Sequence, residues 1–188
     1  MADALSAVVD HLVPGRSGTP GMAGVRFSEI RGSTLIQFAA WPDSAVRAGA
    51  EAAKAVGAKL APKPGRVTTG TDGTLLRVEP LKWWLISETA KAPSLSSEAG
   101  VALDLSQSRT RLHVSGRQAA RLLNHVLPLD LSDTAFPEGS VSSTAFHHIG
   151  VTLWRDGTGF NLFLPRSFAV SLCEILIEIA RQYGLEIA

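Results

Sequence analysis

The order in which short strands and amphipathic helices alternate limits the folds open to this chain more than any other feature. In its second half, residues 109–114 alternate as a strand, and Ser115 with Gln118 forms an S-x-x-Q capping box that predicts a helix start. A hairpin is predicted over residues 149–164, before a closing helix that begins near Ser167. The first of these helices places its apolar residues at i, i+3, i+4 and i+7: Ala119, Leu122, Leu123 and Val126.

The first half of the chain shows the same order of elements. Strands are predicted over residues 25–30 and 34–40, followed by a helix that Asp43 or Ser44 is expected to cap. A second hairpin is predicted over residues 74–86. Each half therefore has the order strand, helix, strand, strand, with a final helix in the second half.

This order predicts an α+β fold made of two similar β-α-β-β passes. Hairpins favour antiparallel or mixed sheets, and the amphipathic helices are expected to pack on one face of them. We expect a mobile N-terminal arm over residues 1–22, because much of this stretch is rich in glycine and proline. The first half then covers residues 23–100 and the second residues 101–188, and the two either fold separately or form one compact domain.

Composition excludes several classes of function. The formal net charge is +1, from 18 basic and 17 acidic residues, so we expect no binding to nucleic acid or to a membrane. Only 19% of the residues are charged and 45% are apolar, which fits a protein that buries part of its surface against a partner and also fits a compact monomer with a large core. The N-terminus lacks the basic and apolar regions of a secretion signal, and we expect a cytoplasmic protein.

The sequence contains no strong catalytic or metal-binding signature. Its single cysteine, Cys173, lies in an apolar helical run that predicts a core position, and it rules out an internal disulfide. His147-His148 is expected on a strand, where adjacent side chains point to opposite faces and do not chelate one metal ion. With no glycine-rich nucleotide loop or nucleophile elbow either, we expect no catalytic, cofactor-binding or metal-binding residue in this chain.

Other polar and aromatic residues are candidates for structural or partner contacts. Asp104 and Ser106 are expected to anchor a turn by bonding to backbone amides, with ligand binding as the alternative. Trp83-Trp84 places one indole on each face of a strand, so we expect one in the core and the other as a lid or a partner anchor. Arg166 is a candidate for an ion pair at an interface. We therefore expect an exposed apolar patch, with these two tryptophans and Arg166 as candidate interface residues.

A series of motifs, each weak alone, occurs in one order over roughly residues 78–180. They are Asp104-Leu105-Ser106-x-Ser108-Arg109, Ser115-Gly116, Leu127-Pro128-Leu129-Asp130-Leu131, Phe136-Pro137-x-Gly139-Ser140, His148-Ile149-Gly150-Val151 and Phe160-x-Leu162-x-Leu164-Pro165-Arg166-Ser167-Phe168-Ala169. In this combination the chain resembles the gamma-subunit family of heterotetrameric sarcosine oxidases. That family is similar in fold to the tetrahydrofolate-binding aminomethyltransferase of the glycine cleavage system.

The resemblance implies a complex with alpha, beta and delta subunits, and mainly a contact with the folate-binding alpha subunit. Such a complex oxidises sarcosine to glycine, giving hydrogen peroxide and a one-carbon unit that passes to tetrahydrofolate. FAD, FMN, NAD, zinc and tetrahydrofolate are then expected in the partner subunits and none in this chain. In the aminomethyltransferases a catalytic aspartate follows the turn that matches His148-Ile149-Gly150, whereas residues 151–154 contain no carboxylate here. This departure predicts that the chain alone is inactive.

Three other interpretations stay open from the sequence. The chain also fits the equivalent subunit of an N-methylglutamate dehydrogenase-type complex, since the flavin subunit selects the substrate. A stand-alone folate-binding protein of the aminomethyltransferase class would need a deep polar pocket with a carboxylate for the pterin. A generic interaction domain would expose the same kind of apolar face and would differ only in the identity of its partner.

Overall fold

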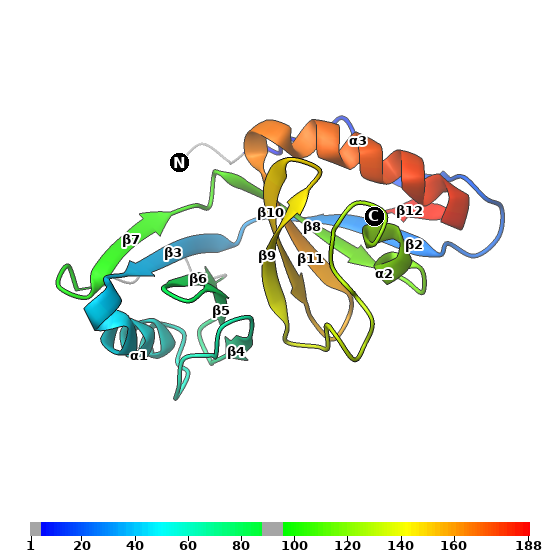
Figure 1. Cartoon of the computed structure of the whole chain (residues 1–188). Helices are drawn as coiled ribbons and strands as arrows, with labels where there is room; N and C mark the ends of the chain where they lie inside the picture. Colours follow the sequence, from blue (N-terminus) through cyan, green and yellow to red (C-terminus); the bar gives the residue numbers. More distant parts are fainter. Residues whose placement is uncertain (1–4, 88–95) are drawn as a thin grey trace. The chain divides into compact units, whose positions relative to one another are not determined.

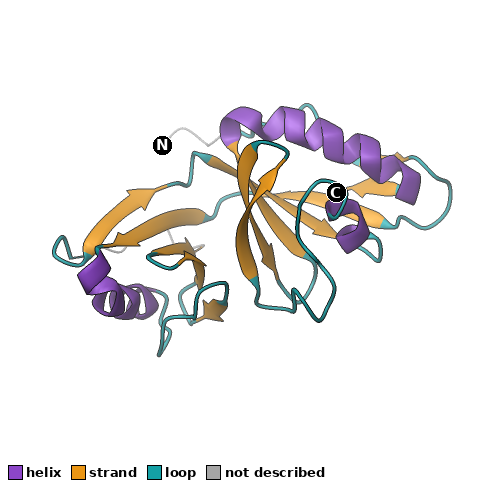
Figure 2. Cartoon of the chain, viewed as in Figure 1, coloured by secondary structure: helices purple, strands orange, loops and turns teal. Residues whose placement is uncertain are grey.

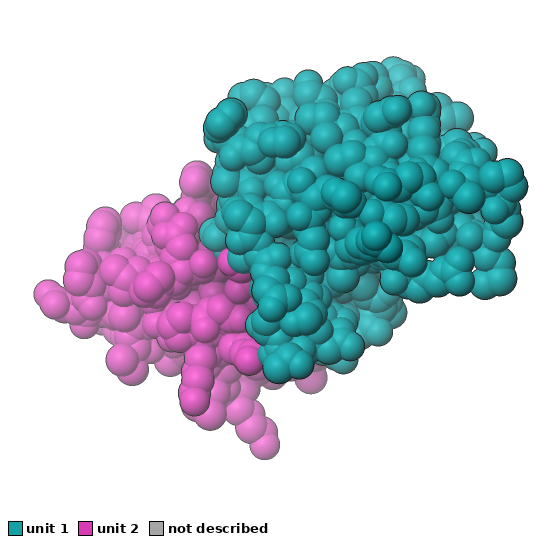
Figure 3. Space-filling model, turned by 45° about the vertical axis from the view of Figure 1, so that its right-hand side comes forward, with its two compact units in different colours: residues 1–31, 108–138, 143–188 teal, residues 32–107, 139–142 magenta. Residues whose placement is uncertain are grey.

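The computed structural model describes residues 5–87 and 96–188, and the chain forms two compact units (Figure 3). Unit 1 comprises Met1–Arg31, Ser108–Glu138 and Ser143–Ala188, and unit 2 comprises Gly32–Gln107 and Gly139–Ser142. Each unit combines a β-sheet with helices, so the predicted α+β class is confirmed. The units do not follow the expected halves along the chain, because unit 2 is inserted between two parts of unit 1.

Unit 1 is built on a seven-stranded sheet with the strand order β1-β12-β2-β8-β11-β10-β9 (Figure 1). β12 joins β2 in parallel, whereas β2, β8, β11 and β10 pair in antiparallel succession. The strands are β1 (Gly15–Ser17), β2 (Val25–Ile30), β8 (Arg109–Ser115), β9 (Val141–Phe146), β10 (Ile149–Arg155), β11 (Phe160–Pro165) and β12 (Leu185–Ile187). β8 shows how alternation builds the core, because Leu112 and Val114 are buried while Arg111 and His113 point to the other face.

Two α-helices pack on the buried side of this sheet. α2 (Ala119–Leu123) is short, and α3 (Ala169–Ala180) follows the 3-10 turn η2 (Arg166–Phe168) and runs along the sheet in Figure 1. A further 3-10 turn, η3 (Arg181–Tyr183), leads from α3 to β12. Cys173 lies on the buried side of α3, as predicted, and burial raises the pKa of its thiol to about 12. The thiol therefore stays protonated and is a core group.

The N-terminal segment is partly packed into unit 1. Val8 and Leu12 belong to the same core cluster as the sheet and α3. β1 pairs with β12, and Arg16 Nη2 lies 2.7 Å from Glu186 Oε2 across that pair. This corrects the expectation of an arm outside the core for the described part of residues 1–22, because two of its apolar residues, Val8 and Leu12, pack against the sheet and helix.

Unit 2 holds a five-stranded antiparallel sheet with the order β4-β5-β6-β3-β7, and α1 (Ala45–Ala55) covers one face (Figures 1 and 2). The 3-10 turn η1 (Pro42–Ser44) precedes α1. The strands are β3 (Thr34–Ala40), β4 (Val67–Thr69), β5 (Thr74–Glu79), β6 (Lys82–Ser87) and β7 (Gly100–Asp104). Ala48 and Ala52 let α1 lie close to the sheet, where Phe38 and Trp83 fill the space beneath it.

The predicted helix caps are wrong, although both helices are present. Ser44 occupies the N-cap of α1, but its hydroxyl donates to the carbonyls of Trp41 at 3.0 Å and Ala99 at 2.5 Å. Gln118 occupies the N-cap of α2 without a side-chain bond, and its own N–H bonds to the Gly24 carbonyl at 3.0 Å. Contacts with segments distant in the chain therefore replace the local caps.

None of the helices within residues 5–87 and 96–188 is long and apolar enough to cross a membrane.

Val8→Ala tests the packing of the N-terminal segment. The substitution leaves a small void in the core of unit 1, and we expect it to lower the free energy of unfolding by about 2 kcal/mol. Val9→Ala is the matched control, because Val9 is exposed, and its effect is expected to stay within about 0.5 kcal/mol. Urea denaturation of the full chain, followed by circular dichroism, measures both. Equal effects of the two substitutions would contradict the packing of this segment.

Candidate interaction surface

His147-His148 lies in the tight turn between β9 and β10, and not on a strand as expected. His147 has a positive φ of 53°, and its ring packs 5.3 Å from the ring of Phe146. Both histidines are exposed. Within residues 5–87 and 96–188, no group of three or more His, Cys, Asp or Glu side chains is arranged to hold a metal ion.

Asp104 and Ser106 anchor a turn at the end of β7, which confirms their structural interpretation. Asp104 Oδ1 accepts a hydrogen bond from the Ser106 N–H at 2.8 Å. Ser106 Oγ in turn accepts one from the Leu35 N–H at 2.9 Å. The hydrogen bonds from Ser106, first from its side chain and then from its backbone, hold the pKa of Asp104 below its usual range.

A polar cluster on unit 1 was missed in the sequence interpretation. Asp156 accepts hydrogen bonds from the Thr158 N–H at 2.7 Å and from Asn161 Nδ2 at 2.6 Å. Asn161 Oδ1 accepts one from Arg111 Nε at 2.9 Å. His113 Nε2 lies 3.1 Å from Thr158 Oγ1 and 3.7 Å from Asp156 Oδ1. The one signal for this cluster in the sequence is an asparagine within an otherwise apolar strand, and Asn161 is fully buried.

The bonds within this cluster identify it as structural. Burial alone would raise the pKa of Asp156, but hydrogen bonds from Thr158 and Asn161 outweigh burial and hold the pKa below its usual range. Its carboxylate also accepts the Gly159 N–H at 2.9 Å, which closes the β10–β11 hairpin. A carboxylate that is strongly bonded in its charged form is a weak base, so the cluster is poorly suited to general base catalysis.

The three candidate interface residues lie at different places in the fold. Trp83 and Trp84 are both buried within the chain, and Trp84 Nε1 donates to Gln37 Oε1 at 3.1 Å. Arg166 Nη2 donates to the carbonyl of Leu5. Neither indole is an exposed anchor in the isolated chain, and contact of these three residues with a partner stays a prediction.

β7 forms one edge of the five-stranded sheet, with β3 on its inner side. The Leu105 N–H bonds to the Leu35 carbonyl at 2.8 Å, so odd-numbered residues in this register direct their backbone groups toward β3. The N–H and C=O groups of Ala102 and Asp104 therefore point away from the sheet. This edge, which we call the β7 edge, offers these backbone groups to an added strand.

Apolar side chains accompany these backbone groups. Val101 and Leu103 are 51% and 52% exposed. Leu103 pairs with Gln37, which pairs with Trp84, so the three side chains share the sheet face opposite α1. β7 contains neither lysine nor proline, the residues that commonly protect an exposed edge strand from pairing.

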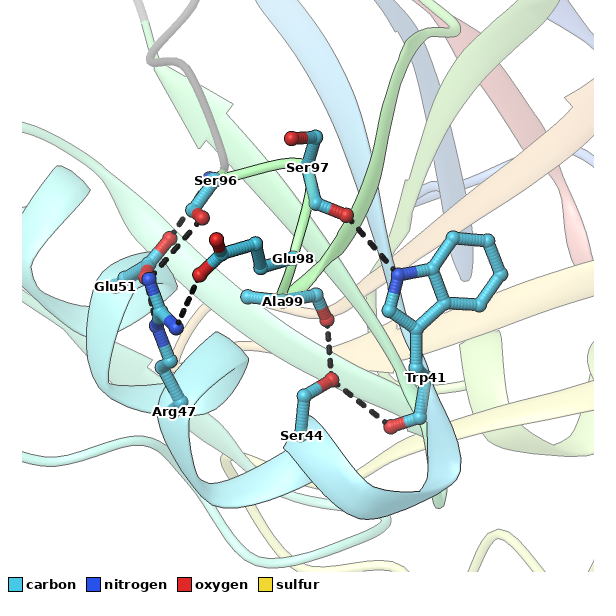
Figure 4. Close-up of polar contacts among 8 residues, drawn as sticks. All are labelled: Trp41, Ser44, Arg47, Glu51, Ser96, Ser97, Glu98 and Ala99. Atoms are coloured by element: carbon cyan, nitrogen blue, oxygen red, sulfur yellow. Dashed lines mark hydrogen bonds and ion pairs between the residues drawn. The ribbon is translucent and has the colours of Figure 1, made fainter.

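A network of polar contacts fixes the residues before β7 to α1 (Figure 4). Arg47 Nε lies 3.1 Å from Glu51 Oε1, and its Nη1 lies 3.1 Å from Glu98 Oε2. The Ser96 N–H donates to Glu51 Oε2 at 2.9 Å and holds the pKa of Glu51 below its usual range. Two more bonds join the residues just before α1 to the same segment: Trp41 Nε1 donates to the Ser97 carbonyl, and Ser44 Oγ donates to the Ala99 carbonyl. These exposed ion pairs add little stability, but together the contacts set where β7 begins.

No family model matches the chain. It is 30% identical over 187 residues to the sarcosine oxidase subunit gamma of Corynebacterium sp. (strain P-1). The match covers 94% of this chain and 90% of that protein. The chain belongs to the sarcosine oxidase gamma-subunit family. The gamma subunit from Arthrobacter sp is 31% identical over 168 residues, covering 85% of this chain and 81% of its own length. These relatives confirm the resemblance that the motifs predict.

Solved structures give the same assignment for this gamma-family chain. A chain of the heterotetrameric sarcosine oxidase from Corynebacterium sp. U-96, solved in complex with pyrrole 2-carboxylate, superposes with a TM-score of 0.77 and 27% identity. The match covers 88% of each chain. The glycine cleavage system aminomethyltransferase T from Bartonella henselae gives a TM-score of 0.60 at 19% identity, covering 87% of this chain and 47% of that one. The second match confirms the predicted aminomethyltransferase-like fold.

Asp156→Asn tests the structural interpretation of the polar cluster. The lowered pKa means that the carboxylate stabilises the folded chain fully above the ordinary aspartate pKa of about 4, and progressively less as the pH falls through the lowered value. We expect the variant to be less stable at pH 7 by about 1–3 kcal/mol. The difference from the natural chain should shrink as the pH falls below about 4.

Urea denaturation at a series of pH values measures this difference. Asp10→Asn is the control, because Asp10 is exposed, and its effect is expected to stay within about 0.5 kcal/mol at every pH. A stability loss for Asp156→Asn that is the same at pH 7 and pH 3 would contradict the role of its charge.

Proposed function

We propose that this chain is the gamma subunit of a heterotetrameric sarcosine oxidase, and that it supports the larger subunits without supplying catalytic groups. The observation that carries the proposal is the match to gamma subunits over nearly the whole length of both chains. The partners are alpha, beta and delta subunits, with alpha as the main contact, in a cytoplasmic complex that converts sarcosine to glycine. FAD, FMN, NAD, zinc and tetrahydrofolate bind to those partners in this proposal.

Two features of the chain support a non-catalytic role. Residues 151–154 contain no carboxylate at the place where the aminomethyltransferases carry a catalytic aspartate. The polar cluster around Asp156 has its hydrogen-bonding groups engaged in holding a hairpin turn. Neither feature supplies a free acid or base for transfer chemistry.

The β7 edge supports docking of another subunit. An extended segment of the partner pairs with the outward backbone groups of Ala102 and Asp104, and its side chains cover Val101 and Leu103. Strand addition of this kind takes its affinity from main-chain hydrogen bonds and its specificity from alternate side chains. The added strand extends the sheet face that carries Trp84. Arg166 contributes indirectly, because its side chain donates to the carbonyl of Leu5 and so holds the N-terminal segment of this chain.

Co-expression with the three other subunits of the same complex tests this function. An affinity tag on this chain is expected to recover all three, and the recovered complex is expected to form hydrogen peroxide in the presence of sarcosine. The chain purified alone is expected to form none. Recovery of the chain without the flavin-containing subunits, under conditions in which those subunits are soluble, would contradict the proposal.

The same experiment tests the docking edge through one substitution. Leu103→Lys places a charge on the exposed side of β7 and is expected to lower recovery of the other subunits by at least about tenfold. Val13→Lys is the matched control, because it places the same charge on another exposed valine, in unit 1. Recovery within about twofold for both variants would exclude the β7 edge as a docking surface while leaving the subunit assignment intact.

A further inference from the structure

A second feature of unit 2 is a groove beside α1, which we call the α1 groove. It has a volume of about 510 Å³ and lies between α1, the residues that follow it, and the strands β5 and β6. Four alanines and two glycines make up half of the residues that line it. The groove is thus formed mainly by side chains too small to fill it.

Gly49 and Trp83 set the depth of the groove. A Cβ atom at Gly49 would lie 3.3 Å from Trp83 Cζ2 and 3.3 Å from Ala61 Cβ, so a larger residue would close this part of the wall. The same position lies 3.8 Å from Trp83 Cε2, the ring atom bonded to Nε1. Trp83 Nε1 is buried and has no hydrogen-bond partner among the residues that the structure describes. A buried N–H without an acceptor costs free energy.

Two large apolar side chains at the groove are almost fully in solvent. Val46 is 90% exposed and Leu60 is 78% exposed, and both line the groove. Covering such side chains with apolar groups is favourable by about 1.5–3 kcal/mol each. Their exposure beside a concave surface therefore favours a partner with apolar side chains of its own.

The charges around the groove are all positive. Lys54, Lys59 and Arg77 line it, and no acidic residue does so in the described part of the chain. Arg77 already donates to the carbonyls of Pro62 and Pro80 and lies 4.8 Å over the ring of Trp83. No ion pair engages Lys54 or Lys59 within residues 5–87 and 96–188. The groove thus combines an apolar surface with two available ammonium groups, which is complementary to an acidic amphipathic segment.

We propose that the α1 groove is the docking site for an acidic amphipathic segment of another subunit of the oxidase complex. The segment places apolar side chains between Val46 and Leu60 and directs carboxylates to Lys54 and Lys59. This inference rests on the proposed function and adds to it a second contact surface, separate in residues from the β7 edge. The groove supplies apolar contact and charge, whereas the edge supplies backbone hydrogen bonds.

Competition during assembly tests the groove. A tagged variant and an untagged natural copy of this chain are co-expressed at equal levels with the other three subunits, and the ratio of the two copies in the purified complex is measured by mass spectrometry. Lys54→Glu combined with Lys59→Glu is expected to lower the share of the tagged copy at least tenfold. Val46→Glu is expected to lower it by a similar factor.

Matched controls separate docking from general effects of the substitutions. Arg117→Glu reverses an exposed cation in unit 1, and Val13→Glu places a carboxylate on an exposed valine there, so both tagged copies should stay within about twofold of the natural one. The thermal midpoint of unfolding of each purified variant checks that it is folded. If the variant with Lys54→Glu and Lys59→Glu is unfolded, the variant with Lys54→Gln and Lys59→Gln is used in its place.

Each outcome of the competition decides a different claim. If the natural copy enters the complex and each groove variant enters it in an equal amount, the docking site is overturned and the subunit assignment stands. Natural copies that fail to enter any complex would overturn the proposed function and this inference with it. A loss for Val46→Glu without a loss for the lysine pair would overturn the acidic character of the segment.

Discussion

Antiparallel pairing between β2 and β8 is the constraint on which the rest of the molecule depends. It brings Phe27 opposite Val114 in the core of unit 1, although residues 32–107 lie between the two strands in the chain. Pairing strands so far apart costs chain entropy before any contact is gained. The sheet of unit 1 therefore forms from two parts of the chain that are separated by the inserted residues. The backbone hydrogen bonds of unit 2 are made within a sheet of its own.

The separate sheet of unit 2 explains where its edge strand and its groove lie. β3 follows β2 in the chain and pairs with β6 on one side and β7 on the other, so β7 is an edge strand with one side unpaired among residues 5–87 and 96–188. α1 covers one face with small residues such as Ala48 and Ala52, and other small residues of the same helix, Gly49 and Ala50, help to form the groove beside it. In unit 1, by contrast, the polar groups around Asp156 bond to one another.

Local periodicity predicted those elements whose two faces differ in burial. The alternation in residues 25–30 and the apolar stripe from Leu172 to Ile179 correspond to β2 and α3. β7 gave no such signal, because residues 101–104 are exposed on both faces. The caps at Ser44 and Gln118 also failed, because partners from distant segments bond to these residues in place of their own helices.

The candidate surface was less predictable than the fold, because it also depends on contacts between residues that are distant in the sequence. Trp83-Trp84 correctly indicated a strand with two opposite faces, but sequence spacing does not reveal that both faces are buried. The β7 edge depends on strand order, and the α1 groove depends on residues from a helix, a loop and two strands that meet only in the folded chain. Its glycine and alanine residues are individually ordinary in a helix or loop, so no local pattern marks them.

Hydrogen–deuterium exchange of the chain, alone and within the assembled complex, tests most directly whether unit 2 carries the docking surface. The account predicts that assembly slows exchange at the amides of Ala102 and Asp104, which point away from the sheet in the isolated chain. Amides of β8 and β11, already paired within unit 1, should exchange equally slowly in both samples. Fast exchange at Ala102 and Asp104 in the complex, with new protection confined to unit 1, would contradict the account.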